Sequence, residues 1–475
     1  MHRRQRLSFV CILLALLNTF SLWSKACGEA AGFSGSSSDN TLAGSLDNSS
    51  DEFTRGYSDL TKRALTAGIE LERFNLNYRL QSVAQPKWRA LRFSLGQEAG
   101  AAGILAFETT ADRQFAIGRK NPAKVSNDAL RGGLIQIVPT SAIAGASSCL
   151  ELGSNAWQAK KNRRMGLGPK QAMQQAVTRF NDLEKILQER QTFVNAHKEH
   201  PAYARALAEG QILDDLRRAE IDEFIHFFAS ARAGAAAENT FYVINAITNI
   251  LGATAGGVAF KSVIQPKFGS DSNVLFTAAG SFGALGPWLS ARVAAFAGRR
   301  AGRSVRIALA QDASFDSAKL TEHRARLRDL LSANPGSLIP SLPAVERLAL
   351  YTESNQRFKK QLETQIATSR HLARVALQQE LLAPLIGGTL TTQGILGEVS
   401  YYRYGAQPRK QLSISLAGSI TSTAGGGLAV TATAAALLAS WAHERSLERR
   451  GQSSAQLIHD RLHYLEKVEK IIQAI

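Results

Sequence analysis

The chain has 475 residues, of which 56 are lysine or arginine and 39 are aspartate or glutamate, so its formal net charge is +17. A chain of this length can bury a large core, and the basic excess suggests contact with an anionic membrane, nucleic acid or acidic polymer. Its three cysteines are too few for a disulfide framework or a multi-cysteine zinc site.

Residues 1–26 have the pattern of a secretory signal peptide. The sequence "MHRRQR" is a positive n-region, an apolar h-region follows from Leu7 to Trp23, and "SKA" fits a small-x-small cleavage site. Export argues against nucleic acid as the partner and favours membrane lipid. Cys27 follows the cleavage site and raises lipidation as an alternative, which Ser24 and Lys25 disfavour because a lipobox has other residue types at their positions.

Residues 27–52 are dominated by Gly, Ser, Asn and Asp and contain few large apolar side chains. Such a segment cannot offset its ordering entropy by burial, so we expect a disordered linker. Residues 53–90 are then expected to be helical.

Two kinds of segment alternate along the rest of the chain. The first kind is charged and amphipathic, with apolar residues at three- and four-residue steps, the period of an α-helix. These segments cover residues 165–238, 301–379 and 443–475. The C-terminal segment is close to a heptad pattern, so a coiled coil is an alternative there. Within the middle segment, "NPGSLIPSLP" at 334–343 predicts a break between helices.

The second kind of segment is apolar and rich in Gly, Ala, Ser and Thr. These stretches come in pairs separated by a short polar turn, which predicts helical hairpins at residues 91–164, 239–300 and 380–442. Residues 240–260 alone would be roughly 30 Å long as a helix, one hydrocarbon thickness. The expected fold is therefore mainly α, with Gly/Ala-rich apolar hairpins embedded in a membrane and alternating with long amphipathic helices. The alternative is a large soluble helical core, and the more charged first hairpin is the weakest candidate for insertion.

Glycine positions suggest an internal repeat of hairpin plus charged helices. The separation of Gly256 and Gly280 along the chain equals that of Gly394 and Gly418. The shift that superposes the first pair on the second also superposes "FTAAGSFG" on "ISLAGSIT", and "SAIAGASS" is a candidate first copy. Chance similarity among small-residue runs is the competing explanation.

The stretch "NILGATAGGVAFKS", residues 249–262, has clustered glycines followed by Lys-Ser, like a phosphate-binding loop, but lacks the spacing that such a loop needs. Such a loop needs glycine directly before lysine, and three apolar residues separate Gly257 from Lys261. We instead interpret the glycines as positions where two helix backbones approach closely in a membrane. The expected helix-packing residues are Gly252, Gly256, Gly280, Gly283, Gly394 and Gly418.

Ionisable and amide side chains inside the apolar segments are candidates for an intramembrane polar role. They are Glu98, Asn245, Asn249, Arg292 and Glu398. Such groups are costly in a bilayer and tend to face a cavity or a partner. The alternative for the acids is that they mark the water interface.

No catalytic, cofactor-binding or metal-binding constellation is expected. "EFIH", Glu223 to His226, has a Glu-x-x-His spacing, but a second copy is missing, so we expect a surface Glu beside a half-buried His. The leading function is a structural or assembly role in the cell envelope, with envelope proteins or a second copy as partners. The alternatives are a transporter with hairpins lining a path and a soluble exported binding protein. Acids facing the bundle axis in two hairpins would favour transport.

Overall fold

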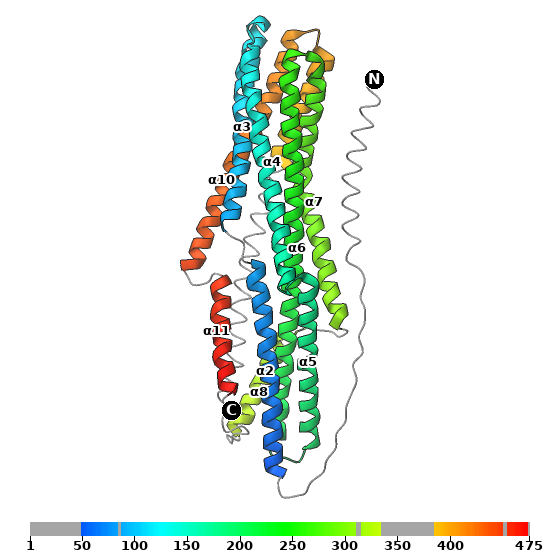
Figure 1. The fold of residues 1–475 in the computed structure, drawn as a ribbon, viewed down its shortest axis with the longest axis vertical. Coiled ribbons are helices and arrows are strands. Elements are labelled where there is room, and N and C mark those ends of the chain that lie inside the picture. The colour runs from blue at the N-terminus through cyan, green and yellow to red at the C-terminus, as the bar shows by residue number, and fades with distance from the viewer. Residues whose placement is uncertain (1–48, 84–86, 310–314, 334–383, 450–453, 474–475) are drawn as a thin grey trace. The chain divides into compact units, whose positions relative to one another are not determined.

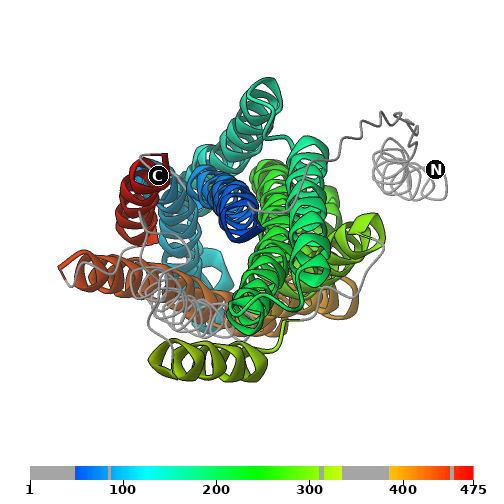
Figure 2. The same cartoon turned by 90° about the horizontal axis from the view of Figure 1, so that it is seen from below.

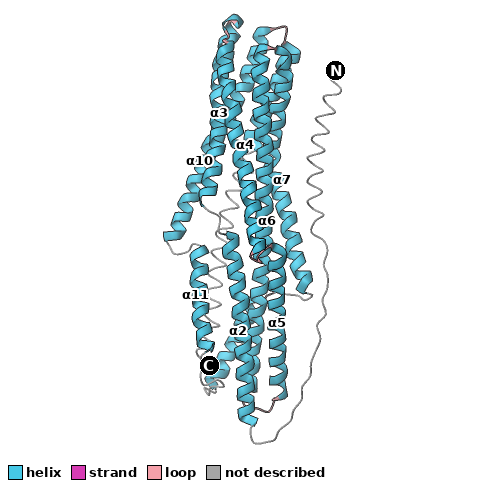
Figure 3. Cartoon of the chain, in the orientation of Figure 1, coloured by secondary structure: helices cyan, strands magenta, loops and turns pink. Residues whose placement is uncertain are grey.

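The computed structural model describes residues 49–83, 87–309, 315–333, 384–449 and 454–473 (Figure 1). These residues are α-helical apart from short turns and 3-10 segments, and none of them lies in a β-strand (Figure 3). The expected mainly α fold is therefore confirmed. All of the described residues except Ser49 belong to one compact unit.

Three pairs of consecutive helices form hairpins. The first joins α3 (Lys87–Lys120) to α4 (Asn127–Arg164) through η2 (Pro122–Lys124). The second joins α6 (Tyr203–Ile264) to α7 (Gly269–Leu309) through η3 (Pro266–Phe268). The third joins the helix at 384–404 to α10 (Pro408–Arg449).

The six hairpin helices contact one another in a closed cycle. The second helix of each hairpin packs on the first helix of the next: α4 contacts α6, and α7 contacts the helix at 384–404. The cycle closes where α10 contacts α3. Apolar side chains from five of these helices pack together, including Phe107, Ile137, Ala255 and Phe276, with Leu390 against them. Where these residues lie along the helices, packed side chains therefore fill the space between them.

The charged segments form a second group of helices around the N-terminal half of α6. They are α2 (Ser49–Val83), α5 (Pro169–Ala196), α8 (Ser317–Ala333) and α11 (Ser454–Gln473). Figure 2 shows α2 and α5 alongside α6. Leu71 of α2, Phe180 of α5, Ile212 of α6 and Leu320 of α8 share one apolar core, and α11 packs on α2 through Leu465. Burial of these amphipathic faces stabilises the group.

Local sequence explains where several helices start and stop. The hydroxyl of Ser126 accepts a hydrogen bond from the backbone N–H of Ala129 at 3.2 Å and caps α4. After α4, Gly166 has a φ of +74°, which an L side chain rarely adopts, so the chain turns there. Pro169 then occupies the first turn of α5, where its missing N–H costs nothing.

Two expected boundaries differ from the observed ones. The sequence pattern places the end of a charged segment at residue 238, whereas α6 runs unbroken from Tyr203 to Ile264. The joining sequence "ASARAGAAAENT" changes in polarity but contains no proline, and alanine favours continuation of the helix. At the other boundary, α2 begins at Ser49, inside the expected linker of 27–52.

Some expectations fall on residues that the structure does not describe. The signal peptide and most of the linker lie outside the described residues. So do the break at 334–343 and the whole second half of the segment 301–379.

Candidate functional site

The tightest backbone approach at the expected glycines joins the second and third hairpins. A Cβ built on Gly280 of α7 would lie 2.5 Å from the backbone nitrogen of Thr391 and 2.6 Å from the carbonyl oxygen of Gly387. Gly394, on the helix at 384–404, faces α7 in return, and its built Cβ lies 2.6 Å from the backbone oxygen of Asn273. At these two positions, glycine allows backbones to approach more closely than any other residue would.

The remaining expected glycines lie at other interfaces or in looser surroundings. Gly256 of α6 faces Ile137 of α4, with 2.9 Å to the nearest methyl carbon. Gly252, Gly283 and Gly418 have ordinary contacts at 3.4 Å or more from a built Cβ. The glycines of the second hairpin therefore do not face one another. The reason is that its two helices use different faces to contact the neighbouring hairpins in the closed cycle.

The expected amides Asn245 and Asn249 belong to a polar cluster between α3, α4 and α6. The Asn249 side chain donates to the Asn245 side-chain oxygen at 2.5 Å and lies 3.5 Å from the side-chain oxygen of Gln97. Gln97 in turn donates to the backbone oxygen of Ala144 and to Ser147, both at 2.9 Å. Asn249 therefore has a partner on α3, and the cluster as a whole links the first two hairpins.

The expected charged groups do not gather at one place. Glu398 accepts a hydrogen bond from Ser270 at 3.1 Å, close to the turns of the second and third hairpins. Arg292 is exposed, with its guanidinium 5.2 Å from the ring centre of Trp288. Glu98 is partly exposed on α3. The structure thus brings Asn245 and Asn249 together and leaves these three apart.

Sequence reasoning did not single out the most enclosed acid between the first and third hairpins, Glu108. Its carboxylate accepts hydrogen bonds from Gln393 at 2.5 Å and Ser419 at 2.7 Å, so it links α3 to both helices of the third hairpin. One turn later on α3, Asp112 accepts from Thr423 at 2.7 Å. The spacing of these two acids by one helical turn was the available signal.

A second buried acid joins the two helices of the first hairpin. Glu151 of α4 is fully buried and accepts from Arg89 at 2.8 Å and from Arg92 at 2.5 Å. Arg89 also reaches Asn155, and it lies 3.6 Å from Glu238 of α6. Buried charges of this kind are tolerated only when they are paired and hydrogen-bonded.

The charged helices line a partly open cavity of about 120 Å³, mainly between α2, α6 and α11. Apolar side chains form most of its wall, and one side is polar. On that side Arg79 pairs with Glu223, and Arg461 pairs with Glu72 at 2.5 Å. Sequence reasoning had no signal for this site, because both pairs join positions far apart along the chain.

Glu220 is the third carboxylate of the cavity wall. Its side chain is half-buried: protein atoms surround it closely, and the surface that stays accessible faces the cavity. The amide nitrogen of Asn75 lies 3.3 Å from its carboxylate and 3.2 Å from its backbone oxygen. Burial raises the pKa of Glu220 well above its ordinary value, and the nearby charges of Glu72 and Glu223 raise that pKa further, while Arg461 and Arg79 act in the opposite direction.

The expectation for "EFIH" is wrong in both of its parts. Glu223 lies inside the cavity wall, paired with Arg79, instead of at the surface. His226 is exposed, with Asp222 at 3.6 Å, instead of half-buried. The rotation of α6 about its axis explains both differences, because Phe224 and Phe228 lie on its buried face and His226 does not. Among the described residues, no group of three or more His, Cys, Asp or Glu is arranged to hold a metal ion.

The raised pKa of Glu220 predicts how the Glu220→Gln variant responds to pH. When the pKa of an acid is higher in the folded chain than in the unfolded chain, the fold is most stable below the unfolded pKa, where the acid is protonated in both states. The free energy of unfolding then falls as pH rises from the unfolded to the folded pKa. The variant should therefore match the parent below the unfolded pKa. Above it, the variant should gain stability over the parent by about 1.4 kcal/mol per pH unit until the folded pKa is reached. Thermal unfolding of both proteins across the mildly acidic and neutral range measures this, and a constant difference across that range would contradict it.

Three of the described segments are long and apolar enough to cross a membrane: Asn127–Ala196, Tyr203–Ile264 and Pro266–Leu309. The first segment contains α4 of the first hairpin together with the charged helix α5, and the other two contain α6 and α7 of the second hairpin. Over its described residues, the third hairpin is not among them. No known protein family, curated protein or solved structure matches the chain significantly.

Proposed function

We propose that the protein is an integral membrane scaffold of the cell envelope. The hairpins are embedded in the bilayer, and the charged helices α2, α5, α8 and α11 lie outside it with the first half of α6. In this arrangement the hairpins anchor the chain in membrane lipid, and the outer helices hold envelope proteins or a second copy. The proposal includes the expected signal peptide as the route of export.

The observation that carries the proposal is where exposed apolar side chains lie. Among the described residues, the large exposed apolar side chains are on the hairpin segments 91–164, 239–300 and 380–442, with the exceptions of Met165, Ile307 and Ile471. Trp157, Leu285 and other hairpin residues are more than half exposed. Exposed apolar surface of this extent marks an interaction or membrane surface, and its spread over all three hairpins favours lipid.

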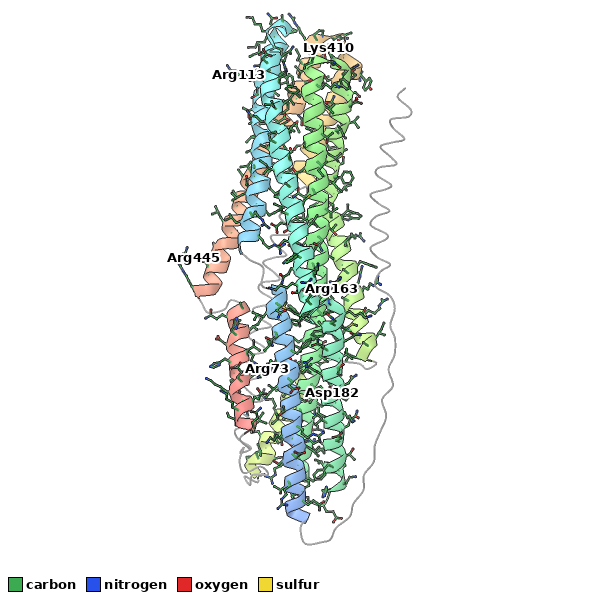
Figure 4. The ribbon with its side chains drawn as sticks, viewed as in Figure 1. Arg73, Arg113, Arg163, Asp182, Lys410 and Arg445 are labelled. Carbon is green, nitrogen blue, oxygen red and sulfur yellow. The ribbon has the colours of Figure 1, made fainter. Side chains whose placement is uncertain are left out.

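Charges flank this apolar surface at a spacing that suits a bilayer. Arg131 and Lys160 on α4 have the same separation along the chain as Arg232 and Lys261 on α6. At about 1.5 Å per residue each separation is roughly 43 Å, close to the thickness of a bilayer with its headgroups. Figure 4 labels Arg113 and Lys410 near the hairpin turns and Arg163 at the other end of α4. Cations at both ends suit contact with both headgroup layers.

A single charge on the apolar surface tests the proposal. Leu285 is 54% exposed on α7, and Ile471 is 47% exposed on α11. Leu285→Arg should insert poorly, since an arginine at mid-helix costs about 2.5–3.5 kcal/mol on insertion. Ile471→Arg is the matched control and should behave as the parent. The measurement is the fraction of chain that stays in the membrane pellet after alkaline carbonate extraction.

Two outcomes of that extraction would contradict the proposal. If the parent chain appears in the supernatant, the hairpins are a soluble core, and an exported helical binding protein becomes the better description. If both arginine variants behave alike, the exposed apolar surface of the hairpins does not face lipid.

Transport is a second candidate, because Glu108 and Asp112 place acids between the first and third hairpins. Both acids, however, lie on α3, and their hydrogen bonds tie them to neighbouring helices. The packed cluster around Phe276 also fills the space between helices. These features favour the scaffold. An ion-flux assay on proteoliposomes with the parent and Glu108→Gln proteins separates the two candidates.

A further inference from the structure

The cavity between α2, α6 and α11 has unmatched hydrogen-bond acceptors. Of its three carboxylates, Glu72 is held by Arg461 and Glu223 by Arg79. A third arginine of the wall, Arg217, is directed to Glu184 at 3.1 Å and to Asp214 at 2.8 Å. The remaining carboxylate, Glu220, receives a hydrogen bond from the Asn75 amide and forms no ion pair of its own with a described residue.

Asn75 supplies a second acceptor beside Glu220. The residue is 4% exposed, and its Oδ1 atom has no hydrogen-bond partner among the described residues. Leaving a buried amide oxygen without a donor costs free energy. Burying the Glu220 carboxylate also costs free energy, because its hydrogen bond comes from a neutral amide and Arg79 and Arg461 act on it only from beyond ion-pair distance. Both costs are reduced if a group with several N–H donors and a positive charge lies between Asn75 and Glu220.

The rest of the cavity sets the size and character of what fits. An engineered apolar cavity of about 150 Å³ is large enough for benzene, so about 120 Å³ suits a body of about four to six carbon atoms. That body would contact apolar side chains. They are Leu65, Ile69, Leu76, Leu213, Leu216 and Leu465.

We propose that this cavity binds a small primary amine as its ammonium ion, with the three N–H donors directed at Glu220 and Asn75 and the carbon chain against the leucines. A divalent metal ion fits poorly, because it needs about six oxygen ligands and two of the three carboxylates are taken up by arginine. An anion fits poorly because the arginines already face carboxylates. This site is independent of the proposed membrane role.

The test compares n-butylamine with 1-butanol, its neutral counterpart, by calorimetric titration of the purified full chain in detergent. The parent should bind the amine at least tenfold more tightly than the alcohol. Glu220→Gln keeps the shape of the wall and should lose that preference while still binding the alcohol. Glu189→Gln, at a largely exposed pair with Arg63, is the matched control and should keep the preference.

A second variant keeps the test decisive. Gly68 lines the cavity, and a Cβ built on it meets nothing within 4 Å. Gly68→Leu should fill the space and abolish binding of both compounds. Equal affinity of the parent for amine and alcohol, an unchanged preference in Glu220→Gln, or unchanged binding in Gly68→Leu would each overturn the proposal.

Discussion

Replacing Gly280 by alanine should destabilise the protein, although alanine is the better helix former. The new methyl group would lie 2.5 Å from the Thr391 backbone nitrogen and 2.6 Å from the Gly387 oxygen, so α7 and the helix at 384–404 must move apart. Backbone atoms cannot rotate away as a side chain can. Overpacking of this kind costs about 1–3 kcal/mol or more, which exceeds the gain of about 1 kcal/mol expected from helix propensity. Thermal unfolding of the purified chain in detergent measures the effect.

Gly283 provides the control on the same helix. Its built Cβ lies 3.8 Å from Thr248 and 3.9 Å from Gly387, which is ordinary van der Waals contact. Gly283→Ala should therefore leave stability unchanged or raise it slightly through helix propensity. If the two alanine variants unfold at the same temperature, the close approach at Gly280 does not hold the second and third hairpins together.

Replacing Arg190 by methionine should cause the largest loss of stability among the charged helices. Arg190 is 2% exposed; it donates to Thr61 at 3.1 Å and to the Ala206 carbonyl at 3.0 Å, and it lies 3.7 Å from Glu209. Methionine keeps most of the apolar stem but removes the charge. The carboxylate of Glu209, which is 1% exposed, then loses this cation. Removing one partner of a buried pair costs about 3–5 kcal/mol.

Arg63→Met is the matched control, because Arg63 also joins α2 to α5 by pairing with Glu189. That pair is 3.2 Å apart and largely exposed, so its loss should cost about 0–1 kcal/mol. Denaturant unfolding followed by circular dichroism compares the two variants. Similar losses in both would mean that enclosure of Arg190 adds nothing to its interactions.

Sequence patterns were sufficient to predict the elements but not their neighbours. The small-residue runs predict three hairpins because they report on a single stretch of chain, and helices are observed over those runs. They carry no information on which helix Gly256 meets, and it meets Ile137 of α4, from the preceding hairpin. Close packing selects neighbours by the shape of whole faces, which periodicity does not describe. The internal repeat stays a prediction.

The candidate site residues likewise fall into those that the local sequence reveals and those that only the fold brings together. Asn245 and Asn249 stand out in an apolar run, so a local reading finds them. Glu72, Glu220 and Arg461 lie in charged segments where such residues are common, and only folding brings them to one wall. The prediction that the glutamate of "EFIH" lies at the surface is wrong. Neighbouring phenylalanines decide which face of α6 is buried, and a single Glu-x-x-His spacing does not show which face that is.

The continuity of α6 has a mechanical consequence. Its 62 residues form one hydrogen-bonded rod of roughly 93 Å, which passes from the charged helices into the apolar hairpins without a hinge. Helices bend sharply only at proline, glycine pairs or inserted groups, and the joining stretch of α6 at 229–240 contains a single glycine, Gly234. The glycine pair of this helix, Gly256 and Gly257, lies further on, close to the hairpin turn. A tilt imposed on the first half of α6 must therefore appear in its apolar half, as far as that glycine pair. A sideways force on the charged helices would therefore act as a torque on the hairpin helices.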